Sequence, residues 1–158
     1  MRIPILGLLA FVAAHLLGAQ QRPAPLTATD FQVLPQLGLP TDSASVRRLL
    51  GRPDSTVRDS NTFDPGAFTV SWFYRGFEIF FPSPDAANAI TLLTRRLATH
   101  RGLRVGDSLA RAAQLYGTPN GADNWRWYLR DPKDGMHVIL IQFAKGRVEL
   151  IRLGWLMD

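Results

Sequence analysis

The sequence has 158 residues, of which 46% are hydrophobic and 20% are charged, and its formal net charge is +5 at pH 7. This composition predicts a folded chain with one core or two small ones, and it argues against intrinsic disorder. The chain contains no cysteine, which excludes disulfide bonds, thiolate metal sites and a cysteine nucleophile. The basic balance fits an anionic partner, and it fits equally a charge that only keeps the protein soluble.

The first 19 residues have the three parts of a secretory signal. Met1 and Arg2 form a short positive region, residues 3–17 are mainly apolar, and Gly18 and Ala19 provide small residues for cleavage. The apolar run is shorter than the ~20 residues that a membrane-spanning helix needs. We therefore expect an exported, periplasmic or secreted protein that is cleaved after Ala19 and does not span a membrane. A retained membrane anchor is the alternative.

Two short helices are predicted over residues 41–50 and 107–116, after an extended lead-in over residues 20–40 that contains four prolines. Each helix begins with Asp or Ser/Thr side chains that can cap the free N–H groups. Each ends at a glycine, Gly51 or Gly117, where the backbone can take a positive φ. A proline two residues further on prevents either helix from continuing.

Six aromatic or β-branched segments predict strands, three after each helix. They are residues 72–75, 77–81 and 88–92, and then 127–130, 139–143 and 149–153. The order helix, strand, strand, strand occurs twice, which indicates an internal duplication. The predicted fold class is α+β: a tandem repeat of a helix plus three antiparallel strands, with the helices packed on one face of a mostly antiparallel sheet. A single irregular domain without a repeat is the alternative.

The expected organisation has five parts. They are a signal peptide at 1–19, the lead-in at 20–40, a first repeat at 41–94, a basic linker at 95–104 and a second repeat at 105–158. The linker contains Arg95, Arg96, Arg101 and Arg104, which either bind an anionic partner or form a solvated surface. Nucleic acid is not expected as a partner.

One stretch of the second half resembles a known family. Residues 102–108 read Gly-Leu-Arg-Val-Gly-Asp-Ser, and a helix follows that ends in Tyr-Gly-Thr-Pro at residues 116–119, before a meander of strands. This pattern resembles the beta-lactamase inhibitory protein-like fold, and it is similar to the outer-membrane assembly lipoproteins of the SmpA/OmlA type, which show it in a single copy. The resemblance covers about residues 38–155. It implies a non-catalytic binding module of the bacterial envelope.

The sequence contains no Gly-x-Ser-x-Gly nucleophile elbow, no phosphate-binding loop and no dinucleotide-binding glycine pattern. His100 and His137 have no second ligand type at metal-binding spacing, and Asp42 and Asp107 are explained as helix caps. We therefore expect no enzyme, no metal and no cofactor. A small exported hydrolase with an unrecognised site and a purely structural envelope domain are the alternatives.

The aromatic residues on the predicted strands suggest a binding surface. Side chains alternate between the two faces of a strand, so one core cannot contain all of them. If Ile79 and Ile141 face the helices, Phe80 and Leu140 face away from them. A sheet face of aromatic residues and arginine has the composition of a protein-binding surface, unless loops cover it. The residues predicted to bind a protein or envelope component are Trp72, Tyr74, Phe80, Trp127, Leu140 and Arg152.

Overall fold

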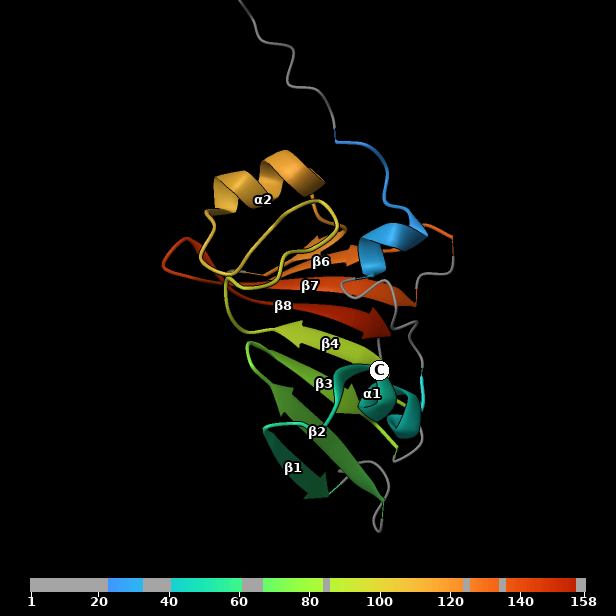
Figure 1. Ribbon diagram of the computed structural model, residues 1–158. Coiled ribbons are helices and arrows are strands. Elements are labelled where there is room, and N and C mark those ends of the chain that lie inside the picture. The colour runs from blue at the N-terminus through green and yellow to red at the C-terminus, as the bar shows by residue number, and fades with distance from the viewer. Residues whose placement is uncertain are drawn as a thin grey trace, which may run out of the picture.

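A single antiparallel sheet of eight strands dominates the fold (Figure 1). The computed structural model describes residues 23–32, 41–60, 67–83, 86–123, 126–133 and 136–155. The predicted signal peptide and its cleavage site lie outside the described residues. The elements are η1 (Ala28–Phe31), α1 (Ser43–Leu50), β1 (Ser55–Ser60), β2 (Phe68–Tyr74), β3 (Phe77–Phe81), β4 (Ala89–Leu92), α2 (Leu109–Tyr116), β5 (Gly121–Ala122), β6 (Arg126–Arg130), β7 (His137–Ala144) and β8 (Arg147–Trp155).

The predicted fold class is wrong, because the chain is β-rich and does not form a tandem repeat of a helix plus three strands. The strand order is β1-β2-β3-β4-β8-β7-β6-β5, so both halves of the chain belong to one continuous sheet. The six predicted strands correspond to β2, β3, β4, β6, β7 and β8. Two more strands, β1 and β5, lie outside the six predicted segments. Strand β1 is exposed along its whole length, and its sequence therefore lacks the alternation of apolar and polar residues that predicts a half-buried strand. Strand β5 has only two residues, which is too short for a sequence pattern.

The two helices lie within the predicted segments, and each is capped by a side chain. Asp42 Oδ1 accepts a hydrogen bond of 2.8 Å from the backbone N–H of Ser45 at the start of α1. At the start of α2 the cap is Ser108, whose hydroxyl accepts from the N–H of Arg111 at 3.1 Å. Asp107 has a different role, since its carboxylate accepts from the backbone N–H of Arg104 at 2.9 Å.

The core lies between the helices and one face of the sheet. Residues that are opposite each other in neighbouring antiparallel strands share a face. The strand register therefore aligns five buried residues in one row from β3 to β6: Ile79, Ile90, Leu153, Ile139 and Leu129. The other elements add Phe31, Val46, Leu103, Ala112 and Tyr116 to the same cluster. Figure 1 shows η1, α1 and the loop before α2 on this side of the sheet. None of the helices in the described part of the chain is long and apolar enough to cross a membrane.

Candidate functional site

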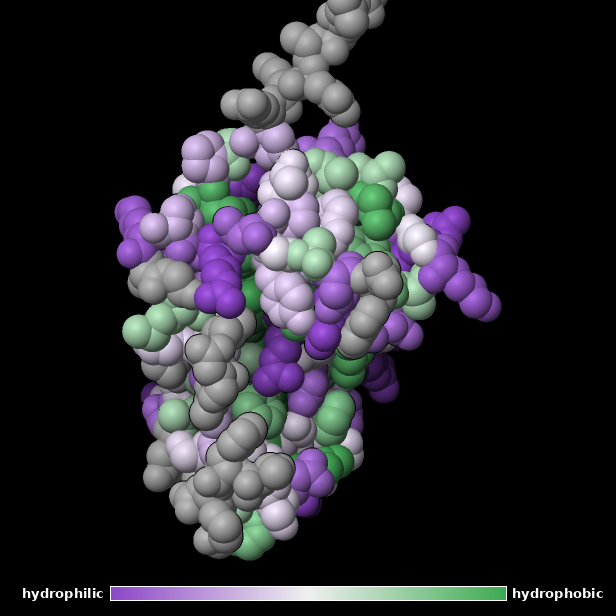
Figure 2. Space-filling view, turned by 180° about the vertical axis from the view of Figure 1, so that it is seen from behind, coloured by the Kyte–Doolittle hydropathy of each residue, from purple (hydrophilic) through white to green (hydrophobic). Residues whose placement is uncertain are grey.

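The opposite face of the sheet, called the free face below, has two rows of side chains at its centre. From β2 to β6 the first row is Phe73, Glu78, Thr91, Arg152, Leu140 and Tyr128. The second row is Ser71, Phe80, Ala89, Gly154, Val138 and Arg130. The helices of the described ranges all pack on the other face. Figure 2 views the molecule from the side of the free face and shows hydrophilic and hydrophobic residues interspersed across it.

Arg152 lies at the centre of the free face, where it has no polar partner among the described residues. Its guanidinium carbon is 4.7 Å from the centroid of the Phe80 ring, so the cation is held over an aromatic face. Within the described part of the chain it forms neither an ion pair nor a side-chain hydrogen bond. Burial lowers the pKa of Arg152, and the negative charge of Glu78 opposes that shift. The Arg152 side chain is half-buried, and its donors have no acceptor among the described residues.

A second polar group of the same row is also unsatisfied. Thr91 is 3% exposed, and its hydroxyl has no hydrogen-bond partner in the described residues. It lies directly opposite Arg152 on one side and Glu78 on the other. Glu78 itself is engaged, because it accepts a hydrogen bond of 2.5 Å from the hydroxyl of Ser71. Buried polar groups without partners are uncommon in native structures and call for an explanation.

Three of the six predicted binding residues come together on the free face. Phe80 and Arg152 are in contact, and Leu140 is the neighbour of Arg152 across the β7–β8 pair. Tyr128 continues the row next to Leu140, and the guanidinium carbon of Arg126 is 5.6 Å from its ring centroid. The sequence prediction omitted Tyr128, although alternation along β6 places it on the face opposite to that of Trp127.

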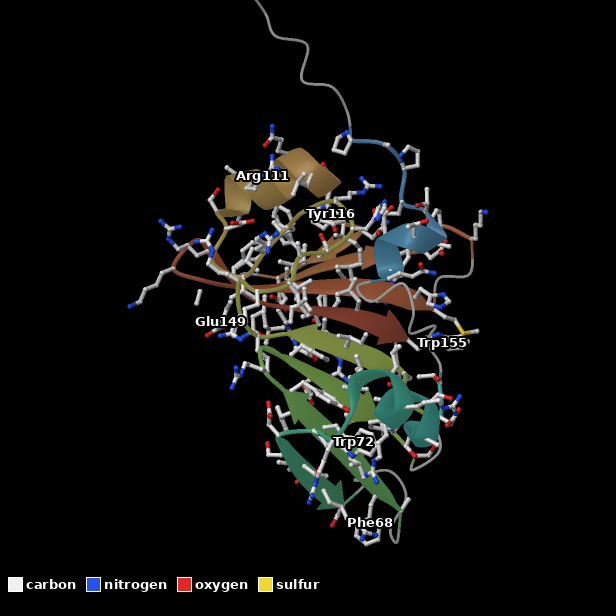
Figure 3. All side chains as sticks on the ribbon, in the orientation of Figure 1. Phe68, Trp72, Arg111, Tyr116, Glu149 and Trp155 are labelled. Atoms are coloured by element: carbon white, nitrogen blue, oxygen red, sulfur yellow. The ribbon has the colours of Figure 1, made fainter. Side chains whose placement is uncertain are left out.

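The other three predicted residues lie on the helix face. Trp72, labelled in Figure 3, is 8% exposed and tilts against Phe81 at 4.7 Å between ring centroids. Tyr74 donates a hydrogen bond of 3.3 Å to the carbonyl of Gly51. Trp127 meets Phe143 edge-on at 5.1 Å. These three aromatic residues hold the helices and neighbouring strands together, on the side of the sheet away from Phe80.

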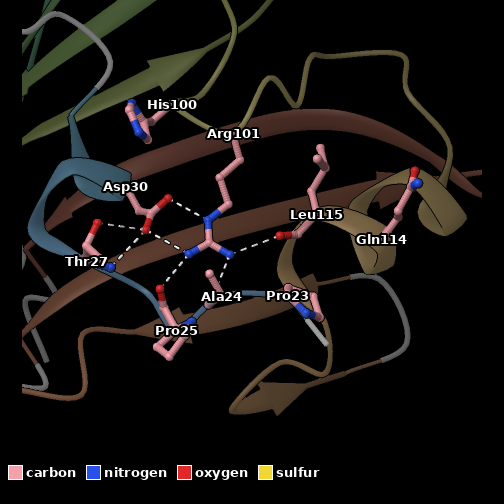
Figure 4. A pocket seen from close by; sticks show the side chains of 9 residues that line it. All are labelled: Pro23, Ala24, Pro25, Thr27, Asp30, His100, Arg101, Gln114 and Leu115. Atoms are coloured by element: carbon pink, nitrogen blue, oxygen red, sulfur yellow. Dashed lines mark hydrogen bonds and ion pairs between the residues drawn. The ribbon is translucent and has the colours of Figure 1, made fainter. Parts of the chain in front are cut away.

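Arg101 has an unusually complete set of hydrogen bonds in an open hollow beside α2 (Figure 4). Its Nε and Nη2 donate to the two carboxylate oxygens of Asp30 at 2.6 and 2.9 Å. Nη1 donates to the carbonyls of Ala24 and Leu115 at 2.8 and 3.0 Å, and Nη2 also donates to the carbonyl of Pro25 at 2.8 Å. All five guanidinium N–H groups therefore have an acceptor. Arg101 fastens the N-terminal segment to the end of α2 and has no donor left for an anionic partner.

The other three arginines of the predicted linker are exposed. Arg104 Nη1 donates to the carbonyl of Arg95 at 2.9 Å, and Arg95 approaches the carboxylate of Asp107 at 3.4 Å. The Arg95 side chain is 69% exposed, and an ion pair of this kind contributes little to stability. An anionic partner at Arg95, Arg96 or Arg104 stays a prediction.

The described ranges contain no group of three His, Cys, Asp or Glu side chains that could hold a metal ion. His137 lies between two aromatic rings, 5.8 Å from that of Phe31 and 5.0 Å from that of Trp155 by centroid. His100 is an exposed residue at the hollow beside Arg101. These positions give the two histidines a packing role and a surface role.

Comparison with known proteins adds little to the site. No family model matches the sequence, and no curated protein matches it. An extracellular protein containing an SCP domain from Bacillus anthracis is similar in structure with a TM-score of 0.46 and 8% identity, over 85% of this chain and 48% of that protein. The chain thus spans about half the length of that protein. The uncharacterised protein YfeY from Escherichia coli gives a TM-score of 0.48 and 11% identity, over 74% of this chain and 90% of that one.

Values this low assign neither a family nor a function. The resemblance of residues 102–119 to the beta-lactamase inhibitory protein-like fold and to the SmpA/OmlA lipoproteins stays a prediction.

Proposed function

We propose that the chain is a non-catalytic binding module, exported to the periplasm or the medium, that holds a protein or envelope component against the free face. One observation carries this proposal: the half-buried guanidinium of Arg152 lies over Phe80 without a polar partner in the described residues, on a face that the described helices do not cover. Aromatic residues and arginine are the residue types most enriched in the energetic centres of protein interfaces.

The setting of these residues favours binding. They stand on strands of a continuous sheet, so their positions are fixed before a partner arrives and little conformational freedom is lost on association. Arg152 is stacked on Phe80, and Tyr128 lies beside Arg126 in the same way. Leu140 separates the two pairs and supplies an apolar contact. A partner would therefore meet a small, mixed surface of rigid aromatic and cationic groups.

A photo-crosslinking amino acid at Leu140 tests this proposal, with one at Leu109 as the matched control. Leu109 is 42% exposed and begins α2, on the helix side of the sheet. Both variants of the full chain are expressed in a Gram-negative host and irradiated in envelope extract. We expect one stoichiometric product from the Leu140 position that the Leu109 position does not give. The same product from both positions, or no product from Leu140, would refute the proposal.

A further inference from the structure

Four short segments meet at one end of the sheet, called the basic end below. They are the β2–β3 turn at 75–76, the segment 93–96 after β4, the segment 104–107 before α2, and the β7–β8 turn at 144–147. The N–H of Leu93 donates to the carbonyl of Gly76 at 2.9 Å, and the N–H of Gly106 donates to the carbonyl of Val148 at 2.7 Å. These backbone contacts hold the segments together, and Figure 1 shows the ends of β2 and β4 and the β7–β8 turn on the same side.

The basic end holds the excess positive charge of the chain. Its cations are Arg75, Arg95, Arg96, Arg104, Lys145 and Arg147, all of them exposed. Asp107 is the one acidic residue of the four segments, so six cations and one carboxylate give them a net charge of +5. The whole chain has 18 basic and 13 acidic residues and also a net charge of +5, so the rest of the chain is balanced. A charge that only keeps a protein soluble is interspersed over its surface, whereas this charge is concentrated at one end.

The positive charge of the basic end is little compensated by the protein itself. Asp107 approaches Arg95 at 3.4 Å, and the other five cations have no carboxylate within 4.0 Å among the described residues. Backbone carbonyls position two of the guanidinium groups. Arg104 Nη1 donates to the carbonyl of Arg95 at 2.9 Å, and Arg147 Nη1 donates to that of Gly106 at 3.0 Å. A neutral carbonyl accepts a hydrogen bond without cancelling the charge, so these arginines remain able to attract an anionic surface.

An exposed apolar side chain lies among these cations. Leu93 is 39% exposed, follows the last residue of β4, and bonds through its N–H to the β2–β3 turn next to Arg75. Arg95 and Arg96 come directly after it in the chain, with Thr94 between. A dissolved polyanion offers no apolar phase for a leucine, whereas a lipid surface has acyl chains beneath its headgroups. Basic residues around an exposed apolar side chain are typical of surfaces that bind membranes containing anionic lipids.

We propose that the basic end docks on a membrane surface that contains anionic phospholipids, with Leu93 entering the headgroup layer. Strands β2, β4 and β7 end there and β3 and β8 begin there, so the sheet meets the membrane with one end of its strands. The free face then remains open at the side. This inference uses a different surface from the proposed function and does not rest on it.

Cosedimentation with lipid vesicles tests the inference on the full exported chain. One set of vesicles contains equal parts of phosphatidylcholine and phosphatidylglycerol. The other contains phosphatidylcholine alone and measures any binding that does not depend on anionic headgroups. We expect at least about ten-fold tighter binding to the anionic vesicles at low salt, and the difference should shrink as salt screens the charges. Equal binding to both sets, or binding to neither, would overturn the inference.

Two double variants locate the surface. Each Lys or Arg near an anionic membrane contributes a factor of about five to the affinity, so Arg96→Gln with Lys145→Gln should weaken binding by about ten- to thirty-fold. Arg130→Gln with Lys133→Gln removes the same charge from exposed positions at the other end of β6 and β7, and it should change binding by less than about two-fold. Equal losses in the two variants would mean that net charge alone governs binding, and the docking surface would be wrong.

Leu93→Ser distinguishes a lipid surface from a dissolved polyanion. The substitution should weaken binding to the anionic vesicles by about three-fold or more, because the serine has no apolar group to bury. Binding to a short duplex DNA depends on the cations, so it should not respond to this change. Unchanged vesicle binding in Leu93→Ser contradicts the entry of Leu93 into the membrane. If the duplex binds as tightly as the anionic vesicles, the basic end recognises polyanions in general and the membrane inference is wrong.

Discussion

Replacing Arg101 with alanine should loosen the N-terminal segment from the body of the fold. The substitution removes the donors to both oxygens of Asp30 and to the carbonyls of Ala24, Pro25 and Leu115. The carboxylate of Asp30 is 2% exposed, and the Arg101 side chain is 14% exposed. The variant therefore leaves a buried negative charge without its cation and a helix end without its donor.

The expected loss is about 2–3 kcal/mol of the free energy of unfolding. Removing one partner of a buried ion pair costs roughly 3–5 kcal/mol, because the remaining charge is uncompensated. Arg101 lies in an open hollow, so water can replace part of what is lost, and the expected loss falls at or below the lower end of that range. A loss of this size is a large share of the 5–15 kcal/mol that stabilises a typical domain.

Urea denaturation at pH 7 measures this loss, and limited proteolysis measures the release of residues 23–32. Alanine at Arg111, an exposed arginine of α2, is the matched control and should change stability by less than about 0.5 kcal/mol. A loss below about 1 kcal/mol in Arg101→Ala, or unchanged cleavage of the N-terminal segment, would refute the reasoning.

The same pair predicts the pH dependence. Burial by itself raises the pKa of Asp30. The hydrogen bonds and charge of Arg101, together with the hydrogen bonds from Thr27, lower the pKa by a larger amount, so the net pKa lies below the ordinary 3.8. Between the folded pKa of Asp30 and its ordinary pKa, the unfolded state binds more protons than the folded state. The stabilisation is therefore complete above the ordinary pKa and is lost as the pH falls through the folded value. The stability difference between the native chain and Asp30→Asn should shrink below about pH 4.

Four further substitutions should give distinct results in urea denaturation. Gly154→Ala should lower the free energy of unfolding by about 1–3 kcal/mol, because an added Cβ would lie 2.6 Å from the Ala89 Cα in the backbone of β4. An unchanged free energy of unfolding would contradict the register of β4 and β8. Thr91→Val should be neutral or stabilising by up to about 1 kcal/mol, since the lost hydroxyl makes no hydrogen bond, and a large loss would indicate a hidden partner. Gly117→Ala should lower the free energy of unfolding more than Gly51→Ala does. A Cβ added at residue 117 would lie 3.2 Å from the Pro23 side chain, while one added at residue 51 has no atom within 4 Å. Equal losses at the two glycines would contradict this difference.

The glycines show how far sequence reasoning reached. Helix-ending glycines with positive φ were predicted at Gly51 and Gly117, and the φ values of 77° and 73° confirm this. Their ψ values of −161° and −146° place them in a region that is essentially restricted to glycine. Local chemistry thus predicted the conformation. It could not predict that Pro23, almost a hundred residues earlier, packs against only one of the two.

Long-range partners explain what the sequence could not predict. Arg101 was grouped with its neighbouring arginines because they form a charge run, yet Asp30 is 71 residues away and Ala24 is 77. Alternation correctly separated Phe80 from its neighbours in β3. It did not fix which face Trp72 and Trp127 would take, because that depends on the pairing between strands.

Arg101 and Arg152 show that the count of acceptors, and not the charge alone, separates a structural arginine from a binding one. Arg101 has five acceptors from its own chain, so its substitution should reduce stability and leave the free face unchanged. Among the described residues, Arg152 has only the Phe80 ring and the more distant charge of Glu78, so its substitution should remove less than about 1 kcal/mol of stability and should impair binding. Because the two residues lie on different faces of one sheet, the two effects should be independent and add in a double variant. A variant of Arg101 that stays folded but loses the crosslinked product from the Leu140 position would show that the two faces are coupled.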